Sequence, residues 1–426
     1  MKILVCGAGI SGTALAFWLS KQTHQHTITV LERFPTLRTS GLQIDLRGPG
    51  IQVLRRMGLE RAFREKAVAE QGLQVVDKRG RRWGYFPANR SGKGLQSFTT
   101  EFEIMRGDLC GLLFEACGGQ TVNQIGVRFV FGVYVVRVTQ VEGGVEVVFS
   151  DGKRGLFDLV VGADGLGSRM RRMMFGVEGE GEDANPGYHS LGAYAGYCTI
   201  RQDMRAGEGY DATAFITTGA RGIMTRRHEP ERYQAYVFCE SSASKRLGNA
   251  SKGDIEEEKI ALAEVFRGAG WESDSILQGL VQSDDFYCER IGVIKLDNWS
   301  QGRIALLGDA AYGPSAMTGM GTSCAMAGAY ILAGEIGKGS SEGDITTALK
   351  NYEQKMRPFI DQVQKGLTDD DNYMGRFPTS SFGITLVYCL VWVASIMRLD
   401  ILARWVLRED TKDWELPEYP DMDGSS

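Results

Sequence analysis

The spacing of apolar residues near the start of the chain predicts a strand, a helix and a second strand. Residues 3–6 (ILVC) form a continuous apolar run, residues 13–19 (TALAFWL) are apolar and helix-forming, and residues 27–31 (TITVL) return to strand composition. The first run ends directly in the glycine-rich turn GAGISG at 7–12. We therefore expect a βαβ unit whose helix begins at the glycines.

The glycine spacing in this unit is typical of a dinucleotide site. Gly7 permits a tight turn, Gly9 lets the backbone approach a pyrophosphate, and Gly12 lets the helix pack closely on the strand. Glu32 ends the second strand 20 residues after Gly12, where a carboxylate binds ribose hydroxyls, and Arg33 beside it is a further candidate contact. The pattern alone does not distinguish FAD from NAD.

Two later segments show the same order of features, an apolar strand followed by a glycine and then an acidic residue. They are FDLVVGADG at 157–165, with Asp164, and GRIALLGDAA at 302–311, with Asp309. Asp309 can accept hydrogen bonds from ribityl hydroxyls. Gly319 and Gly321 then lead into a small-residue helix at 322–332, whose amino end would stabilise negative charge on a reduced flavin. Together the three signatures predict one FAD bound across a discontinuous domain.

In their order these motifs resemble the FAD-dependent aromatic hydroxylases, the group A flavin monooxygenases, over residues 1 to about 335. The likeness is greatest to tetracycline-inactivating enzymes and to fungal monooxygenases of secondary metabolism. It implies tightly bound, non-covalent FAD, with NADPH or NADH as a transient reductant that needs no Rossmann domain of its own. It also implies O2 and a flavin C4a-hydroperoxide that oxygenates an aromatic, polyketide-like or terpenoid small molecule. Hydroxylation, epoxidation and Baeyer-Villiger oxidation all remain open.

The same resemblance nominates further residues. The EIMRGDL segment at 103–109 implies that Arg106 contacts FAD, and residues 41–45 imply the same for Asp45. Arg38 stands where the family can place a nicotinamide-cofactor contact, although a solvated side chain is the alternative. Tyr312 replaces a common histidine and Ala316 a common proline, which leaves open an oxidase or cyclase without oxygen insertion, or a catalytically silent ligand-binding flavoprotein.

Between the flavin segments, strand-like runs predict a mainly β substrate domain. They lie at 192–200, 212–217, 222–226 and 233–238, and a hairpin at 72–85 could join the same sheet. The residues proposed to line the substrate pocket are Tyr194, Phe215, Met224 and Arg226. Because alternation does not show which face a residue occupies without a register, each could equally be a core or outer residue.

The predicted fold is therefore α/β, with a split Rossmann-type FAD domain, an inserted β domain and C-terminal helices. The expected FAD domain comprises 1–71, 101–180 and 285–340, the substrate domain 72–100 and 181–284, and the helical region 341–426. A chain of 426 residues exceeds what one core usually serves. The net charge of −5 gives no case for nucleic acid, and the eight scattered cysteines suggest no metal site. We expect a cytoplasmic monomer or weak dimer.

The C-terminal region contains a long uncharged run, residues 382–397 (FGITLVYCLVWVASIM). Because a bilayer-spanning helix needs roughly 20 apolar residues, this run is short for a membrane span. A helix buried between the domains is the expectation. Interfacial membrane attachment through 382–407, whose pattern becomes amphipathic from Arg398 onward, is the alternative.

Overall fold

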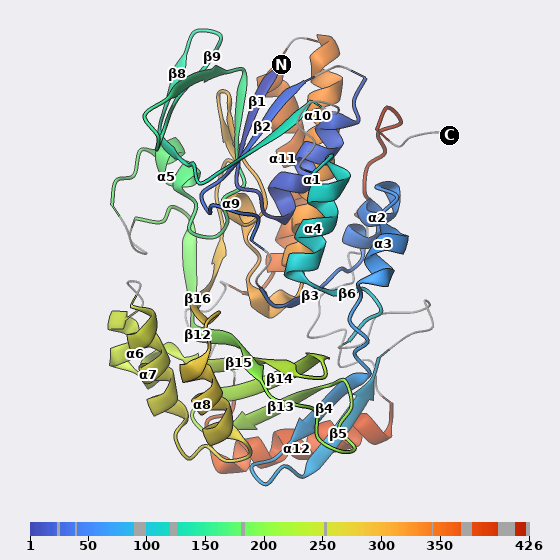
Figure 1. The fold of residues 1–426 in the computed structure, drawn as a ribbon, viewed down its shortest axis with the longest axis vertical. Helices are drawn as coiled ribbons and strands as arrows, with labels where there is room; N and C mark the ends of the chain where they lie inside the picture. The colour runs from blue at the N-terminus through green and yellow to red at the C-terminus, as the bar shows by residue number, and fades with distance from the viewer. Residues whose placement is uncertain are drawn as a thin grey trace.

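The computed structural model shows two sheet-based units, one above the other in Figure 1. It describes residues 1–23, 26–38, 41–88, 99–119, 126–179, 184–250, 254–342, 344–367, 377–398 and 414–422. The predicted α/β fold, with a Rossmann-type unit and a second, mainly β unit, is confirmed.

The first unit contains a six-stranded sheet with the order β17-β18-β11-β1-β2-β7. Its strands are β1 (Lys2–Cys6), β2 (Thr27–Glu32), β7 (Val127–Phe131), β11 (Leu159–Gly162), β17 (Ser300–Gln301) and β18 (Ile304–Leu306). Only β17 runs antiparallel to its neighbour. The central strands are continuous apolar runs because both faces of this parallel sheet are covered. The strand order brings β1, β11 and β18 side by side although they are far apart in sequence.

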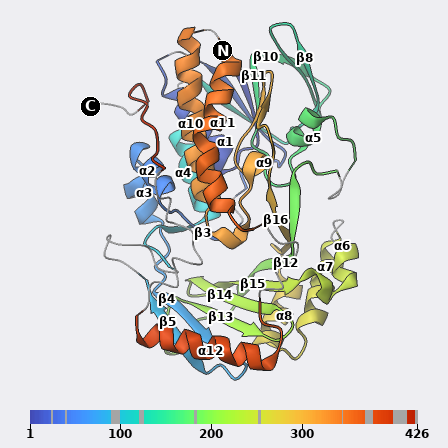
Figure 2. The same cartoon turned by 180° about the vertical axis from the view of Figure 1, so that it is seen from behind.

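Helices cover one side of this sheet, and a small antiparallel sheet packs at β1 and β11 (Figures 1 and 2). The helices that pack together on that side are α1 (Ile10–Ser20), α2 (Pro49–Arg56), α4 (Arg106–Ala116), α10 (Gly321–Glu342) and α11 (Ile345–Gln364). The small sheet comprises β8 (Val135–Val141), β9 (Gly144–Phe149) and β10 (Arg154–Phe157). Shorter elements are β3 (Gln43–Asp45), α3 (Glu60–Glu65), β6 (Glu103–Met105), α5 (Arg169–Phe175), α9 (Asp309–Tyr312) and the 3-10 turn η2 (Ala316–Thr318).

The second unit is built on a seven-stranded sheet with the order β16-β12-β15-β14-β13-β4-β5. Its strands are β4 (Gly72–Val76), β5 (Arg82–Pro87), β12 (Tyr188–Arg201), β13 (Asp211–Thr217), β14 (Arg221–Glu229), β15 (Arg232–Glu240) and β16 (Tyr287–Ile294). The hairpin at 72–85 thus joins the sheet predicted from 192–238. Because β16 pairs with β12, residues 287–294 belong to this sheet, and not to the FAD segment that was expected to begin at 285.

Helices pack on both faces of the seven-stranded sheet. One face is covered by α6 (Lys245–Ala250), α7 (Ile255–Phe266) and α8 (Ser273–Gln282), after the turn η1 (Ser241–Ala243). At the β4–β5 edge the other face carries α12 (Ser381–Ile396), which crosses the base of the molecule (Figure 2). The expected C-terminal helical region is therefore divided, since α11 packs on α10 of the first unit.

The helix α12 is not buried between the domains, so that expectation is wrong. Ile384, Tyr388 and Ala394 are buried against the sheet, whereas Phe382 and Leu390 on the other side of the helix are exposed. Residues 399–407 of the predicted amphipathic stretch lie outside the described residues. Within the described chain, no helix combines the length and apolar character needed to cross a bilayer.

Candidate cofactor site

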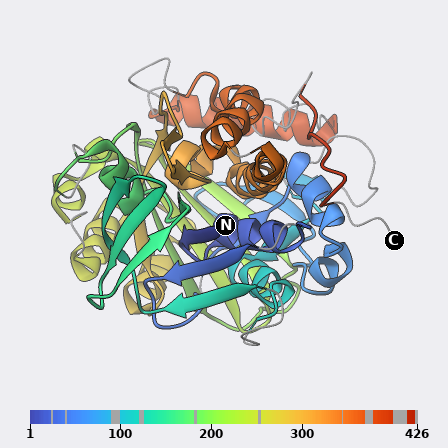
Figure 3. The ribbon, with the colours of Figure 1, turned by 90° about the horizontal axis from the view of Figure 1, so that it is seen from above.

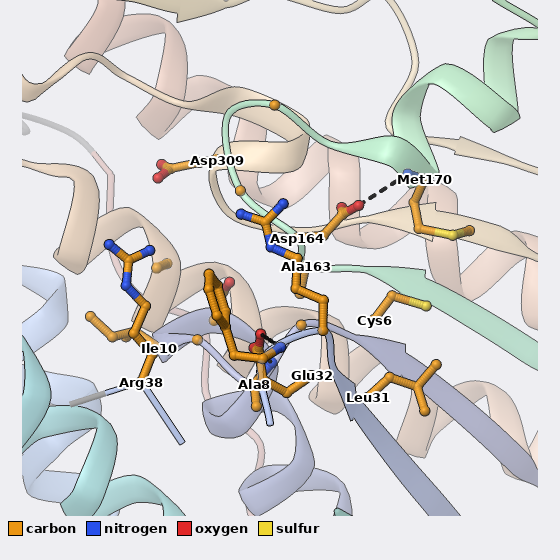
Figure 4. Close-up of a pocket in the computed structure, with 18 of the residues that line it drawn as sticks. Cys6, Ala8, Ile10, Leu31, Glu32, Arg38, Ala163, Asp164, Met170 and Asp309 are labelled. Carbon is orange, nitrogen blue, oxygen red and sulfur yellow. Dashed lines mark hydrogen bonds between the residues drawn. The ribbon is translucent and has the colours of Figure 1, made fainter. Parts of the chain in front are cut away.

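A cavity of about 380 Å³ lies at the carboxyl edge of the six-stranded sheet, where the three glycine-rich segments meet (Figure 4). Parallel α/β sheets bind ligands at this edge because all strands deliver their following loops there. The predicted residues that line the cavity are Gly7, Gly9, Glu32, Arg33, Arg38, Arg106, Asp164, Asp309 and Gly321. Gly12, Asp45 and Gly319 are not among its lining residues.

The three glycines of the first turn serve different purposes. Gly7 has a φ of 114°, and a Cβ there would lie 2.4 Å from the carbonyl oxygen of Ala163. A Cβ on Gly12 would lie 2.0 Å from the carbonyl oxygen of Gly7. Both glycines are therefore required by the packing of the protein itself. A Cβ on Gly9, by contrast, would meet only Nη2 of Arg106, at 3.7 Å, so its small size leaves room in the cavity.

Arg106 and the amino end of α1 provide an anion-binding wall. Among the residues that the structure describes, the buried Nη1 atom of Arg106 finds no hydrogen-bond partner, and its guanidinium lies beside Gly9. The helix α1 begins at Ile10, and its N-cap residue Gly9 supplies no side-chain cap, so the first N–H groups are available at the cavity edge. A buried cation left without a partner is costly unless a ligand supplies the anion. The pyrophosphate of a dinucleotide fits this donor set.

The three predicted acids differ in how much of each carboxylate is free. Glu32 accepts hydrogen bonds from the backbone N–H of Ala8 at 3.2 Å and of Phe34 at 3.1 Å. Asp164 accepts from the N–H of Arg169 at 2.8 Å and of Met170 at 3.1 Å, so it caps α5 as well as lining the cavity.

Asp309, the first residue of α9, faces the cavity. Burial raises the pKa of its carboxyl, and the nearby Arg106 and Arg171 oppose this shift. Within the described part of the chain its carboxylate accepts no hydrogen bond from protein, which leaves both oxygens available to cofactor hydroxyls. A ribityl-binding role for Asp309 stays a prediction.

Sequence reasoning missed the wall formed by Val133 and Tyr134, between β7 and β8, and by Val135, the first residue of β8. The guanidinium of Arg169 lies 4.4 Å from the centroid of the Tyr134 ring and closes this end of the cavity. No local motif marks the loop. It reaches the site because β7 pairs in parallel with β2, which delivers the residues after β7 to the same edge as Glu32.

Asp45 and Arg38 occupy different surroundings. Asp45 forms an ion pair with the buried Arg47, whose N–H donates to Oγ of Ser323 at 2.8 Å. The side chain of Arg38 lines the cavity, with its guanidinium 6.0 Å from the centroid of the Tyr287 ring on the seven-stranded sheet. Arg38 thus lies where the two units meet, while contacts of both residues with cofactors stay predictions.

The four predicted pocket-lining residues lie on two opposite faces of the seven-stranded sheet. Tyr194 and Phe215 pack in the cluster under α7, so the expectation that they line a pocket facing the cofactor is wrong. Met224 and Arg226 point to the face turned toward the first unit, because Met224 pairs with Tyr236 in the register. The residues that share this face and were not predicted are Tyr197, Tyr236, Phe238 and Tyr287.

Arg226 forms a buried ionic cluster between the two units. Its Nε and Nη2 donate to Glu70 at 2.8 and 2.9 Å, and its Nη2 also contacts Glu103 of β6. Burial and the neighbouring Glu70 raise the pKa of Glu103 to about 7, although Arg226 opposes the shift. Gln43 of β3 donates from Nε2 to Glu70 at 3.0 Å. Since β3 and β6 pair as a two-stranded antiparallel sheet, here called the β3–β6 ribbon, the cluster ties β14 to this ribbon.

Tyr312, which replaces the family histidine, is a core residue. Its hydroxyl lies 3.3 Å from that of Tyr352, and a Cβ on Gly328 would lie 1.9 Å from the same hydroxyl. Its ring packs 4.6 Å from that of Trp299. The substitution therefore fills space against α10 and α11 and does not line the cofactor cavity.

Comparison with known proteins agrees with this geometry. Residues 1–366 match the family described as "FAD binding domain". The chain is 41% identical over 99% of both chains to the FAD-dependent monooxygenase asL4 of Sarocladium schorii. It is 36% identical over 98% of both chains to the flavin-dependent monooxygenase eupH of a Phoma species. The structure of tetracycline destructase Tet(55) superposes with a TM-score of 0.76, at 28% identity and 98% coverage of both chains.

The fold and the site thus define an FAD-binding oxidoreductase. The chain belongs to the FAD-dependent monooxygenase family, for which NAD(P)H is the typical reductant.

Replacing Asp309 tests its place in the site. We expect Asp309→Ala to weaken FAD binding by about 5- to 150-fold, because cofactor hydroxyls lose their acceptor at a cost of about 1–3 kcal/mol. Asp309→Asn keeps an acceptor and should lose less. Fluorescence titration of apoprotein with FAD measures both dissociation constants. Unchanged affinity in Asp309→Ala would remove this residue from the site.

Arg226→Met should lower the free energy of unfolding by about 3–5 kcal/mol, because it leaves Glu70 and Glu103 buried without their cation. Arg226→Lys is the matched control, since it keeps the charge and should lose less. Urea denaturation at saturating FAD provides the measurement. An unfolding free energy of Arg226→Met within about 0.5 kcal/mol of wild type, as expected for a neutral surface substitution, would contradict a stabilising role of Arg226 in the buried ionic cluster.

Glu103 should make stability depend on pH. Its pKa is raised from 4.5 to about 7 in the folded chain, so the folded state binds this proton more tightly than the unfolded state does. The resulting contribution of Glu103 to the free energy of unfolding is fully present below pH 4.5 and is lost as the pH rises through 7. Glu103→Gln should reduce the slope of unfolding free energy by up to about 1.4 kcal/mol per pH unit in this window. The pKa values of Glu258 and Glu289 are also raised to about 7. Part of the pH dependence of the unfolding free energy therefore remains in both the wild type and Glu103→Gln. Parallel pH profiles of the two proteins would contradict this.

Proposed function

We propose that this protein uses NAD(P)H and O2 to oxygenate an aromatic, polyketide-like or terpenoid small molecule. The observation that carries the proposal is the junction between the cofactor cavity and the aromatic face of the seven-stranded sheet. Leu42 and Met317 of the first unit pack against that face with Tyr236 and Met224. FAD, when bound, supplies hydride acceptance and oxygen transfer, and the protein supplies binding and orientation.

The face turned toward the cofactor is rich in aromatic rings. The centroid of the Tyr197 ring lies 4.8 Å from that of Tyr287, 5.7 Å from Tyr236 and 6.1 Å from Phe238. Such surfaces hold flat apolar molecules through ring contacts and exclude water from the reacting centre. Burial raises the pKa of Tyr197, so its hydroxyl remains a neutral donor.

Arg38 joins this face to the cofactor cavity. Its guanidinium lies 5.7 Å from the Phe34 ring at the cavity wall and 6.0 Å from the Tyr287 ring. A cation at this junction suits the phosphates of a transient nicotinamide cofactor. This position supports the predicted contact over the alternative of a freely solvated side chain.

The relatives support oxygenation as the reaction class. Both asL4 and eupH are named as monooxygenases, and the chain matches each of them over nearly its full length. The oxidase or cyclase reading rested partly on Tyr312, which the structure places in the core. Hydroxylation, epoxidation and Baeyer-Villiger oxidation differ in which substrate carbon faces the flavin, and all three incorporate one atom of O2.

Turnover with labelled oxygen tests the proposal. Purified holoenzyme would be screened with phenolic, polyketide-like and terpenoid compounds for stimulated NAD(P)H oxidation, followed by mass spectrometry of products formed under ¹⁸O2. We expect one labelled atom in the product of an active compound. A dehydrogenated product without label would favour an oxidase, and NAD(P)H consumption unaffected by every compound would favour a silent binder.

Neighbouring residues of β14 provide a matched pair for the pocket. Met224→Ala changes the face turned toward the cofactor and should raise KM for the active compound severalfold, because it removes apolar contact. Ile223→Val changes the opposite face, where Ile223 packs in the cluster under α7, and should leave KM unchanged. Equal effects of the two variants would contradict the assignment of faces.

A further inference from the structure

The outer face of α12 carries several exposed apolar side chains that the proposed function does not use. Phe382 is 82% exposed, Leu390 58%, Ile396 62% and Met397 61%. Together with Leu386 they lie at helical spacing along one stripe. The helix is roughly 24 Å long and lies across the base of the molecule. Soluble monomers rarely expose a continuous apolar surface of this kind without a partner.

The opposite face of α12 fixes this stripe in its outward position. The hydroxyl of Tyr388 lies 2.9 Å from the carbonyl oxygen of Val76 and 2.7 Å from that of Ile216, and its single proton is shared between these two acceptors. At the carboxyl end of the helix, Oγ of Ser395 donates to the carbonyl oxygen of Tyr85 at 3.1 Å. These bonds anchor the helix to three strands, so the stripe cannot turn inward without breaking them.

A basic hairpin turn borders the helix. The turn between β4 and β5 exposes four basic residues, Lys78, Arg79, Arg81 and Arg82. The guanidinium of Arg81 lies 5.4 Å from the centroid of the Trp83 ring, and this ring lies 5.6 Å from that of Tyr388. The basic turn therefore borders α12 on the side through which Tyr388 packs on the sheet, next to the exposed stripe's opposite face.

The acid of the same turn offsets only part of this charge, because Asp77 adds one negative charge beside four positive ones. Asp77 accepts hydrogen bonds from the N–H of Arg79 at 2.9 Å, the N–H of Arg81 at 3.0 Å and Nε1 of Trp83 at 3.0 Å. Its carboxylate is thus used to hold the turn. On α12 itself, residues 381–397 carry no charge, so no acid interrupts the stripe.

We propose that α12 and the 78–82 turn form a surface that binds the interface of an anionic lipid bilayer. The stripe would enter the boundary between headgroups and acyl chains, and the basic turn would contact acidic headgroups. Trp392, 52% exposed on the same helix, is of the residue type enriched at such interfaces. A second copy of this chain fits the surface less well. A symmetric dimer through this face would bring two basic turns into one interface, where their like charges repel.

Vesicle flotation tests this surface independently of catalysis. The full-length holoenzyme would be mixed with vesicles of phosphatidylcholine alone or of phosphatidylcholine with phosphatidylserine. We expect flotation with the anionic vesicles, reduced by salt. Leu386→Gln/Leu390→Gln/Ile396→Gln should reduce the vesicle-bound fraction by more than about tenfold, because three apolar side chains no longer enter the interface. Arg81→Gln/Arg82→Gln should weaken the preference for anionic vesicles, because two of the four basic side chains are lost.

The matched control is Val141→Gln/Ile260→Gln/Val281→Gln, which changes three exposed apolar side chains on other elements. It should float like wild type. A second readout uses Cys389, the exposed cysteine of α12, labelled with an environment-sensitive fluorophore. Its emission should shift to the blue with anionic vesicles.

Two results would overturn the proposal. One is wild-type protein that floats with neither vesicle. The other is a wild-type dimer that the α12 triple variant converts to monomer, without any flotation. NAD(P)H oxidation measured on the same samples shows whether each variant keeps its active site, so failure of the lipid surface is distinguishable from failure of the proposed function.

Discussion

Parallel pairing of β1 with β11, and of β11 with β18, is the constraint on which the cofactor site depends. Each strand ends in a glycine turn, and the shared direction of the strands brings all three turns to one edge. Figure 3, seen from above, shows the early and late parts of the chain brought together in this unit. The turn glycines then make close backbone approach possible, as at Gly7 against Ala163.

The second constraint is electrostatic. Arg226 stands between Glu70 and Glu103 where the seven-stranded sheet meets the β3–β6 ribbon. A buried ion pair adds little net stability over an apolar replacement, but it is costly to break and it fixes geometry. Because Arg226 shares a face with Met224 and Tyr236, the cluster holds the aromatic surface at a set distance from the cofactor cavity.

The helix α12 shows how one apolar run can serve two purposes. One side packs on the β4–β5 edge of the sheet, next to the basic turn, and covers apolar residues there, and the other side remains open to solvent. The exposed side adds nothing to the stability of the isolated chain. Its presence is therefore best explained by a partner surface, for which an anionic bilayer has the matching chemistry.

The sequence by itself determined the βαβ unit, the cofactor class and most of the strands, because glycine spacing and apolar runs act over a few residues. Its motifs identified Gly9 and Asp309, and its resemblance to a known family nominated Arg106, and the structure brings all three to one cavity. Only the tertiary structure decided which face Tyr194 and Phe215 occupy, that 133–135 complete the cavity wall, and that α12 is half exposed. These features depend on strand register and on pairing between distant segments, and a shift of one residue in register would exchange the two faces of a strand.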